Sequence, residues 1–152
     1  RFKGAMSELC EFTDDAYKPV ITDPQLHQSQ KVKRVILCSG QVYYDVLEAR
    51  KQRECEDEVA IVRLEQLYPF PHKAMQEVLQ QFAHVKDFVW CQEEPLNQGA
   101  WYCSQHHFRE VIPFGASLRY AGRPASASPA VGYMSVHQKQ QQDLVNDALN
   151  VD

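Results

Sequence analysis

The sequence predicts an α/β domain in which helices cover both faces of a mostly parallel sheet. Strand-like and helix-like segments alternate along the chain, which is the pattern of βα units. Two of the strand-like segments, 59–64 and 87–92, are nearly continuous apolar runs, as expected for strands with both faces buried. The length of 152 residues suits one domain with a single core. Right-handed crossovers between parallel strands would then place helices on both sides of the sheet.

The chain is predicted to divide into a leading segment, residues 1–31, and the α/β domain, residues 32–152. The leading segment is mixed and polar, and Pro19 and Pro24 interrupt it, so we expect it to connect from a preceding domain. Part of the segment could lie as a short extended stretch on the domain, through Tyr17, Val20 and Ile21.

Four strands and four helices are expected to alternate in the α/β domain. The strands are rich in β-branched and apolar residues and are predicted at 32–37, 59–64, 87–92 and 117–120. The helices carry apolar residues on one face and are predicted at 42–54, 72–82, 100–111 and 137–150. Ser135 is the expected N-cap of the last helix, which follows a loop rich in Pro, Ala and Ser at 122–133.

Composition and charge argue against several classes of protein. The formal net charge is -4, from 16 basic and 20 acidic residues, so there is no basis for expecting nucleic acid or an anionic membrane as a partner. No apolar run is long enough to span a bilayer, and no signal-peptide pattern opens the chain. The first residue is Arg1 rather than Met, which favours a piece of a longer polypeptide.

The five cysteines are expected to be reduced thiols in a cytoplasmic protein. Their number is odd and no CxxC pair occurs, which argues against a secreted disulfide framework. A metal site built from Cys91, Cys103 and His106 or His107 would need a second closely spaced ligand pair, which the sequence lacks. We therefore predict no metal site, and the same residues give no better support for a cysteine–histidine nucleophile.

Loops at the carboxyl ends of the predicted strands are the expected place for a ligand. The first of these turns, residues 38–40, carries a single glycine and lacks a dinucleotide fingerprint, so a plain turn is favoured over an anion site. Glu93 and Glu94 follow a strand as paired acids, but neighbours in a strand point to opposite faces. We expect them to bond loop amides or an arginine rather than to act together on a substrate.

Three cations lie near the expected strand ends: Lys73, Arg119 and Arg123. They could receive a phosphate or a carboxylate group of a ligand. They could equally form ion pairs with Glu65, Glu93 or Glu94. Both interpretations stay open because both need the same geometry.

Two long stretches resemble a known family. VAIVRLEQLYPFPHKAM, at 59–75, followed by FVWCQEEPLNQGAW, at 88–101, is similar to the C-terminal region of 2-oxoglutarate dehydrogenases from enterobacteria and their relatives. The tail LRYAGRPASASPAVGYMSVHQKQQQDLVNDAL, at 118–149, is similar to the same region. The resemblance covers about residues 32–152, and long matched strings of this kind are more specific than a short motif.

The resemblance implies a transketolase C-terminal type of fold, a three-layer α/β/α domain with a mostly parallel sheet and an antiparallel edge. It implies a homodimeric enzyme that uses thiamine diphosphate and Mg²⁺ to decarboxylate 2-oxoglutarate and passes the succinyl group to a lipoyl arm. In that family a Gly-Asp-Gly motif and a downstream Asn hold the metal diphosphate, and this chain has no Gly-Asp-Gly. None of its six histidines matches the substrate-facing ones of the family, so we expect no catalytic and no cofactor-binding residues here.

The resemblance also implies a candidate effector site. In actinobacterial relatives this domain helps to form an allosteric acetyl-CoA site, and Gln66 and Lys73 resemble part of it. The match is partial, because those relatives have consecutive arginines where this chain has Lys73-Ala74. Together with the two strand-end arginines, the predicted set of allosteric ligand residues is Gln66, Lys73, Arg119 and Arg123.

The favoured interpretation is a non-catalytic domain of a cytoplasmic 2-oxoglutarate dehydrogenase that supports the dimer and its regulation. The expected partners are the preceding domains of the same polypeptide, the dimer mate and the dihydrolipoyl succinyltransferase component. One alternative is the C-terminal domain of a transketolase or of a pyruvate or branched-chain 2-oxo acid dehydrogenase. EEPLNQGAW and GRPASASP argue against it, since they are associated with the 2-oxoglutarate branch. The other alternative is a stand-alone ligand-binding module, which the missing initial Met disfavours.

Overall fold

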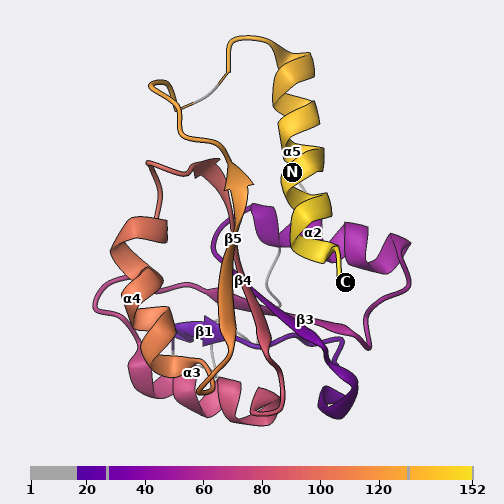
Figure 1. Cartoon of the computed structure of the whole chain (residues 1–152), viewed down its shortest axis with the longest axis vertical. Coiled ribbons are helices and arrows are strands. Elements are labelled where there is room, and N and C mark those ends of the chain that lie inside the picture. Colours follow the sequence, from indigo (N-terminus) through magenta and orange to yellow (C-terminus); the bar gives the residue numbers. More distant parts are fainter. Residues whose placement is uncertain (1–16, 27, 130, 152) are drawn as a thin grey trace.

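A five-stranded sheet forms the middle layer of the computed structural model, which describes residues 17–26, 28–129 and 131–151 (Figure 1). The strands lie in the order β1-β3-β2-β4-β5. They span Val20–Ile21 (β1), Arg34–Cys38 (β2), Val59–Leu64 (β3), Asp87–Pro95 (β4) and Ser117–Arg123 (β5). The short β1 pairs antiparallel with β3, and the other pairs are parallel. The sheet is therefore mostly parallel with an antiparallel edge, as predicted.

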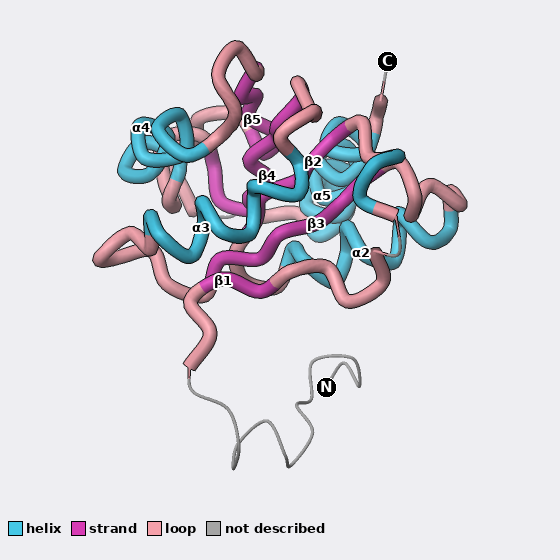
Figure 2. Tube along the Cα trace, turned by 90° about the horizontal axis from the view of Figure 1, so that it is seen from below, coloured by secondary structure: helices cyan, strands magenta, loops and turns pink. Residues whose placement is uncertain are grey.

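Helices cover both faces of this sheet (Figure 2). On one face lie α3 (His72–Leu79), its 3-10 extension η3 (Gln80–Phe82) and α4 (Trp101–Val111). On the other face lie α2 (Val42–Gln52) and α5 (Met134–Leu149). A further 3-10 turn, η2 (Ser29–Lys31), precedes β2. The arrangement confirms the predicted three-layer α/β/α class.

Alternation along the central strands explains why their sequences are almost entirely apolar. In β2, Val35 and Leu37 enter the core beneath α3 and α4, whereas Ile36 and Cys38 enter the core beneath α2 and α5. Strands β3 and β4 alternate in the same way, and all five residues of β2 are buried. Because helices cover both faces of the sheet, a polar side chain on either face would lose its hydration. Both sets of side chains are therefore apolar.

Several predicted boundaries were wrong by a few residues. The first strand begins at Arg34 rather than residue 32, because Val32 closes the turn of η2 by donating its N–H to the carbonyl of Ser29. Strands β4 and β5 run on to Pro95 and Arg123, since their pairing resumes after an irregularity in β4. Residue 122 is therefore in a strand, not in the loop predicted at 122–133.

The start of the last helix also differs from the prediction. It begins at Met134, three residues before the expected start at residue 137. The N-cap is Tyr133, in an extended conformation, and the N–H of His137 bonds its carbonyl at 3.0 Å. Ser135 therefore lies within the first turn and is not the N-cap.

Two buried arginines, Arg34 and Arg50, join the ends of neighbouring helices and strands through ion pairs and hydrogen bonds. Arg50 of α2 is fully buried, forms an ion pair with Asp23 and donates to the carbonyl of Val59 at 2.9 Å. Arg34 at the start of β2 pairs with Asp87 at 2.5 Å and donates to carbonyls at the end of α5. The first pair confirms that the stretch around Val20 and Ile21 packs on the domain, although the predicted boundary at residue 31 itself stays a prediction.

Candidate functional site

A crevice opens where the chain leaves the neighbouring strands β2 and β4 toward opposite faces of the sheet. The chain leaves β2 to form α2 on one face, and leaves β4 to form α4 on the other. Ligands of open α/β sheets bind at such a reversal, outside the carboxyl ends of the strands. The Ser39-Gly40 turn, Tyr68 and residues 92–94 line a hollow here that continues to the first turns of α4. This hollow, which we call the strand-end crevice, is the candidate ligand site.

Gln92 builds one wall of the strand-end crevice. Its side chain is almost fully buried, and its Oε1 accepts hydrogen bonds from Trp90 Nε1 at 2.8 Å and from the Trp101 N–H at 3.1 Å. Its Nε2 donates to the Gln98 carbonyl at 2.8 Å and to the carbonyls of Glu94 and Pro95 at the end of β4. Gly99 has φ +68, and a Cβ there would lie 2.9 Å from this Nε2. One buried amide thus fixes the whole connection from β4 to α4.

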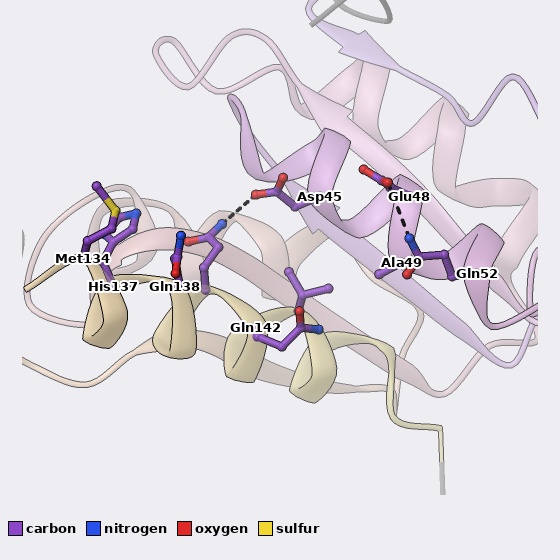
Figure 3. A pocket seen from close by; sticks show the side chains of 10 residues that line it. Asp45, Glu48, Ala49, Gln52, Met134, His137, Gln138 and Gln142 are labelled. Atoms are coloured by element: carbon purple, nitrogen blue, oxygen red, sulfur yellow. Dashed lines mark hydrogen bonds between the residues drawn. The ribbon is translucent and has the colours of Figure 1, made fainter.

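A second hollow, the α2–α5 groove, lies between the two helices of the other face (Figure 3). Asp45 and Glu48 face it from α2, and Met134, His137 and Gln138 face it from α5. A hydrogen-bond chain closes its end: Arg123 donates to Gln141 at 2.8 Å, and Gln141 donates to Asp45 at 2.8 Å.

Negative charge gathers where the two hollows approach each other. Glu93 and Glu94 line both the strand-end crevice and an extension of the groove. The strand is irregular between Cys91 and Pro95, so the simple alternation that we expected for the two acids does not apply. Burial raises the pKa of Glu93, and the charges of Glu94 and Asp45 raise it further, while Arg123 lowers it. Glu93 and Arg123 line the same extension of the groove, and no hydrogen bond joins these two described residues.

The predicted effector residues fall on opposite sides of the sheet. Gln66 follows β3, where its Nε2 donates to the carbonyl of Pro69 at 2.7 Å, and Lys73 lies exposed in the first turn of α3. Arg119 and Arg123 both lie against α5, but four residues of extended strand put them about 13 Å apart. Arg119 pairs with Asp147 near the end of α5 at 3.3 Å, whereas Arg123 bonds His137 near its start at 3.1 Å. The four residues therefore do not form one site, and effector binding at any of them stays a prediction.

Cys91 lies apart from the other cysteine and the histidines weighed for a metal site. Cys91 is buried in the core beneath α2 and α5, whereas Cys103, His106 and His107 lie on α4 across the sheet. Burial raises the pKa of Cys91 to about 12 and that of Cys38 well above its usual value, so neither thiol supplies a thiolate. Cys103 and His107 both line the strand-end crevice, but no hydrogen bond joins these two described residues.

The strand-end crevice presents groups that can recognise a ligand. Among the described residues, the strand-end crevice offers buried amide and carbonyl groups, two acids and the exposed faces of Leu67 and Tyr68. It brings together no nucleophile hydrogen-bonded to a base, which acyl transfer would need.

No described helix is both long and apolar enough to cross a membrane.

Comparisons with known proteins identify the family. A model of the 2-oxoglutarate dehydrogenase C-terminal family matches residues 6–149. The chain is 58% identical over 146 residues to the 2-oxoglutarate dehydrogenase E1 component of Haemophilus influenzae, covering 96% of the chain and 16% of that relative. The protein of the same description from Cupriavidus necator is 51% identical over 97% of the chain, and the one from Azotobacter vinelandii is 49% identical over 99%.

The similarity extends over the strand-end crevice and both helical layers, because the matched residues run from before β1 to the end of α5. The chain spans 16% of the length of each of these three relatives. This protein chain thus belongs to the 2-oxoglutarate dehydrogenase C-terminal family.

Proposed function

We propose that the chain works as the C-terminal domain of a 2-oxoglutarate dehydrogenase, the thiamine-dependent component that decarboxylates 2-oxoglutarate and passes the succinyl group to lipoamide. The observation that carries the proposal is identity of 49% to 58% over nearly the whole chain to proteins described as 2-oxoglutarate dehydrogenase E1 components. In this proposal the enzyme is a cytoplasmic homodimer of the tricarboxylic acid cycle. It delivers its product to the dihydrolipoyl succinyltransferase component of a multienzyme complex.

The residues of this chain do not by themselves fit thiamine diphosphate and Mg²⁺. The strand-end crevice is lined by Glu93 and Glu94, whose negative charge would repel a diphosphate. The sequence also lacks the Gly-Asp-Gly motif that the resemblance associates with the metal diphosphate. We therefore assign the chain a structural role, in which it supports the dimer and its regulation while preceding domains hold the cofactor.

Exposed apolar side chains support a role in contact with other domains. Tyr68 is 92% exposed beside the strand-end crevice, and Tyr133 and Met134 are 78% and 70% exposed at the start of α5. Large apolar side chains gathered on a surface mark places where a partner packs. The preceding domains and the dimer mate are the partners that the proposal assigns to these surfaces.

Activity measurements on two polypeptides test the proposal. The 152-residue chain with thiamine diphosphate and Mg²⁺ should release no CO₂ from 2-oxoglutarate above the cofactor-only background. A longer polypeptide that ends in this chain should decarboxylate 2-oxoglutarate and succinylate lipoamide in the presence of the transferase component. Turnover by the short chain would contradict the structural role, and a longer polypeptide that prefers pyruvate would contradict the substrate.

Effector binding is tested separately. Acetyl-CoA is titrated into the longer polypeptide, because an effector bound to Gln66 and Lys73 should be lost in Lys73→Ala and kept in Lys139→Ala, a matched exposed lysine on α5. Arg119→Ala examines the arginine on the opposite face of the sheet. Equal affinity in the parent, Lys73→Ala and Arg119→Ala would remove these two residues from any effector site.

A further inference from the structure

Two histidines and a glutamate meet where α3 packs on α4. His72 opens α3, and His107 and Glu110 lie one turn apart on α4. The His72 Nε2 is 3.2 Å from the Glu110 Oε2, and the His107 Nδ1 is 3.8 Å from the same oxygen. One potential ligand atom from each of the three residues lies within 4.8 Å of the other two.

These separations match those of donors around a small transition-metal ion. In a tetrahedral zinc site with Zn–N bonds near 2.0 Å, two donor atoms lie about 3.3 Å apart. Two imidazole nitrogens and a carboxylate oxygen are also donors that Zn²⁺ prefers, and three protein ligands leave one position for water. From this geometry we infer that His72, His107 and Glu110 form a binding site for a divalent transition metal, with Zn²⁺ as the preferred ion.

The hydrogen bond on the far side of the His72 ring supports a ligand role. Its Nδ1 lies 3.2 Å from the carbonyl of Phe70, so Nδ1 carries the proton and donates. In the neutral ring the Nε2 then presents a lone pair to the Glu110 carboxylate, which is also an acceptor. Two acceptors at 3.2 Å need a positive charge between them, either a proton on the ring or a metal ion.

His107 distinguishes the metal from the proton. Its Nδ1 is buried, and it makes no hydrogen bond to the described residues around it. A simple ion pair between His72 and Glu110 leaves this polar atom unsatisfied, which is unfavourable for a buried nitrogen. A metal ion between the three side chains satisfies His72, His107 and Glu110 at once.

The surroundings hold both rings in place. Phe70 is buried and stacks on the His107 ring at 4.8 Å, with its edge meeting His72 at the same centroid distance. The Glu110 side chain is 60% exposed, so an ion can reach the site from solvent. Since the ligands come from two helices, the ion would clamp α3 to α4.

Cobalt titration of the tag-free chain tests the site. After treatment with a chelator, Co²⁺ is expected to bind one to one and to give the strong visible absorption of a tetrahedral complex, which Zn²⁺ then displaces. His72→Gln and His107→Gln should each weaken Co²⁺ binding by at least about tenfold. The matched control is His84→Gln, since His84 is exposed and lies outside the cluster, and its affinity should not change.

Thermal unfolding gives a second measurement. Zn²⁺ should raise the melting temperature of the parent chain and of His84→Gln, and should leave that of His72→Gln unchanged. Circular dichroism without metal checks that each variant is folded, which we expect because His72 is only partly buried. Weak, unsaturated Co²⁺ binding, or equal affinity in the parent and His72→Gln, would show an ion pair only and overturn the proposal. Neither result depends on the proposed enzyme activity.

Discussion

The two faces of the sheet are built from different kinds of side chain. The core beneath α3 and α4 contains most of the large aromatic residues, with Phe82, Phe88, Trp90 and Phe108 almost fully buried. The core beneath α2 and α5 consists mainly of valine, isoleucine, leucine, alanine and cysteine side chains. The aromatic face also contains the Gln92 network, whereas the aliphatic face continues into the polar α2–α5 groove.

The difference shows how one sheet can support two roles. On the aromatic face, Trp90 of β4 stacks on Phe108 of α4 at 4.8 Å. On the aliphatic face, only the second half of α5 is buried, through Leu144, Val145, Ala148 and Leu149, and its first half projects beyond the sheet (Figure 1). The aromatic face therefore forms one wall of the crevice, whereas the first half of α5 leaves surface exposed on the aliphatic side.

The largest expected effect is on the aromatic face. Phe108→Ala should lower the free energy of unfolding by about 3 to 5 kcal/mol, because it removes a fully buried ring from beside Trp90. Phe114→Ala is the matched control, since Phe114 is fully exposed and should change stability by less than about 0.5 kcal/mol. Urea denaturation measures both, and equal effects would mean that the aromatic core does not stabilise the fold as we describe.

The next effect concerns the ion pair that joins β1 to the aliphatic face. Asp23→Asn should cost about 3 kcal/mol, because it leaves the charge of the fully buried Arg50 without a partner. Asp57→Asn makes the same substitution in an exposed pair with Lys31 at 3.6 Å and should cost less than about 1 kcal/mol. A small loss in Asp23→Asn would show that residues before β2 contribute little to the domain.

Phe108→Ala and Asp23→Asn concern two kinds of feature, of which the sequence predicts the first, core burial, but not the second, a long-range ion pair. The burial of residues 59–64 and 87–92 follows from apolar runs, because every position of a doubly covered strand must avoid water. Asp23 and Arg50 are 27 positions apart, and no local pattern links them. Their pairing depends on where the chain places β1, which is a property of the whole fold.

The same limit applies to the candidate sites. The strand-end crevice was predictable from the strand–loop order, since ligand sites of such sheets lie at the carboxyl ends. The cluster that we propose as a metal site was not predicted, because His72 and Glu110 are 38 positions apart and meet only when α3 packs on α4. The one local signal was the spacing of His107 and Glu110, which puts them on one face of a helix.

A smaller effect is expected where Gln92 organises the crevice wall. Gln92→Ala should cost about 2 kcal/mol, because the buried N–H groups of Trp90 and Trp101 lose their acceptor. Gln76→Ala, at an exposed position of α3, should be nearly neutral. Tryptophan fluorescence should report the loss of order at this wall. An unshifted spectrum with unchanged stability would mean that the loop from β4 to α4 holds its shape without Gln92.

The smallest expected effect concerns Glu93, which lies where the α2–α5 groove approaches the strand-end crevice. This effect on stability depends on pH. The pKa of Glu93 is raised in the folded chain, so the folded state holds a proton that the unfolded state releases more readily. The free energy of unfolding should therefore fall as the pH rises from the ordinary glutamate pKa through the raised pKa of Glu93. This pH dependence should vanish in Glu93→Gln. The melting temperature of Glu93→Gln should exceed that of the parent at neutral pH and match it at acidic pH, with Glu77→Gln, at an exposed glutamate of α3, as the control. A constant difference in melting temperature between the parent and Glu93→Gln across this pH range would show that the Glu93 carboxyl is as well solvated as a surface acid. The contrast between the two faces of the sheet would then not include Glu93.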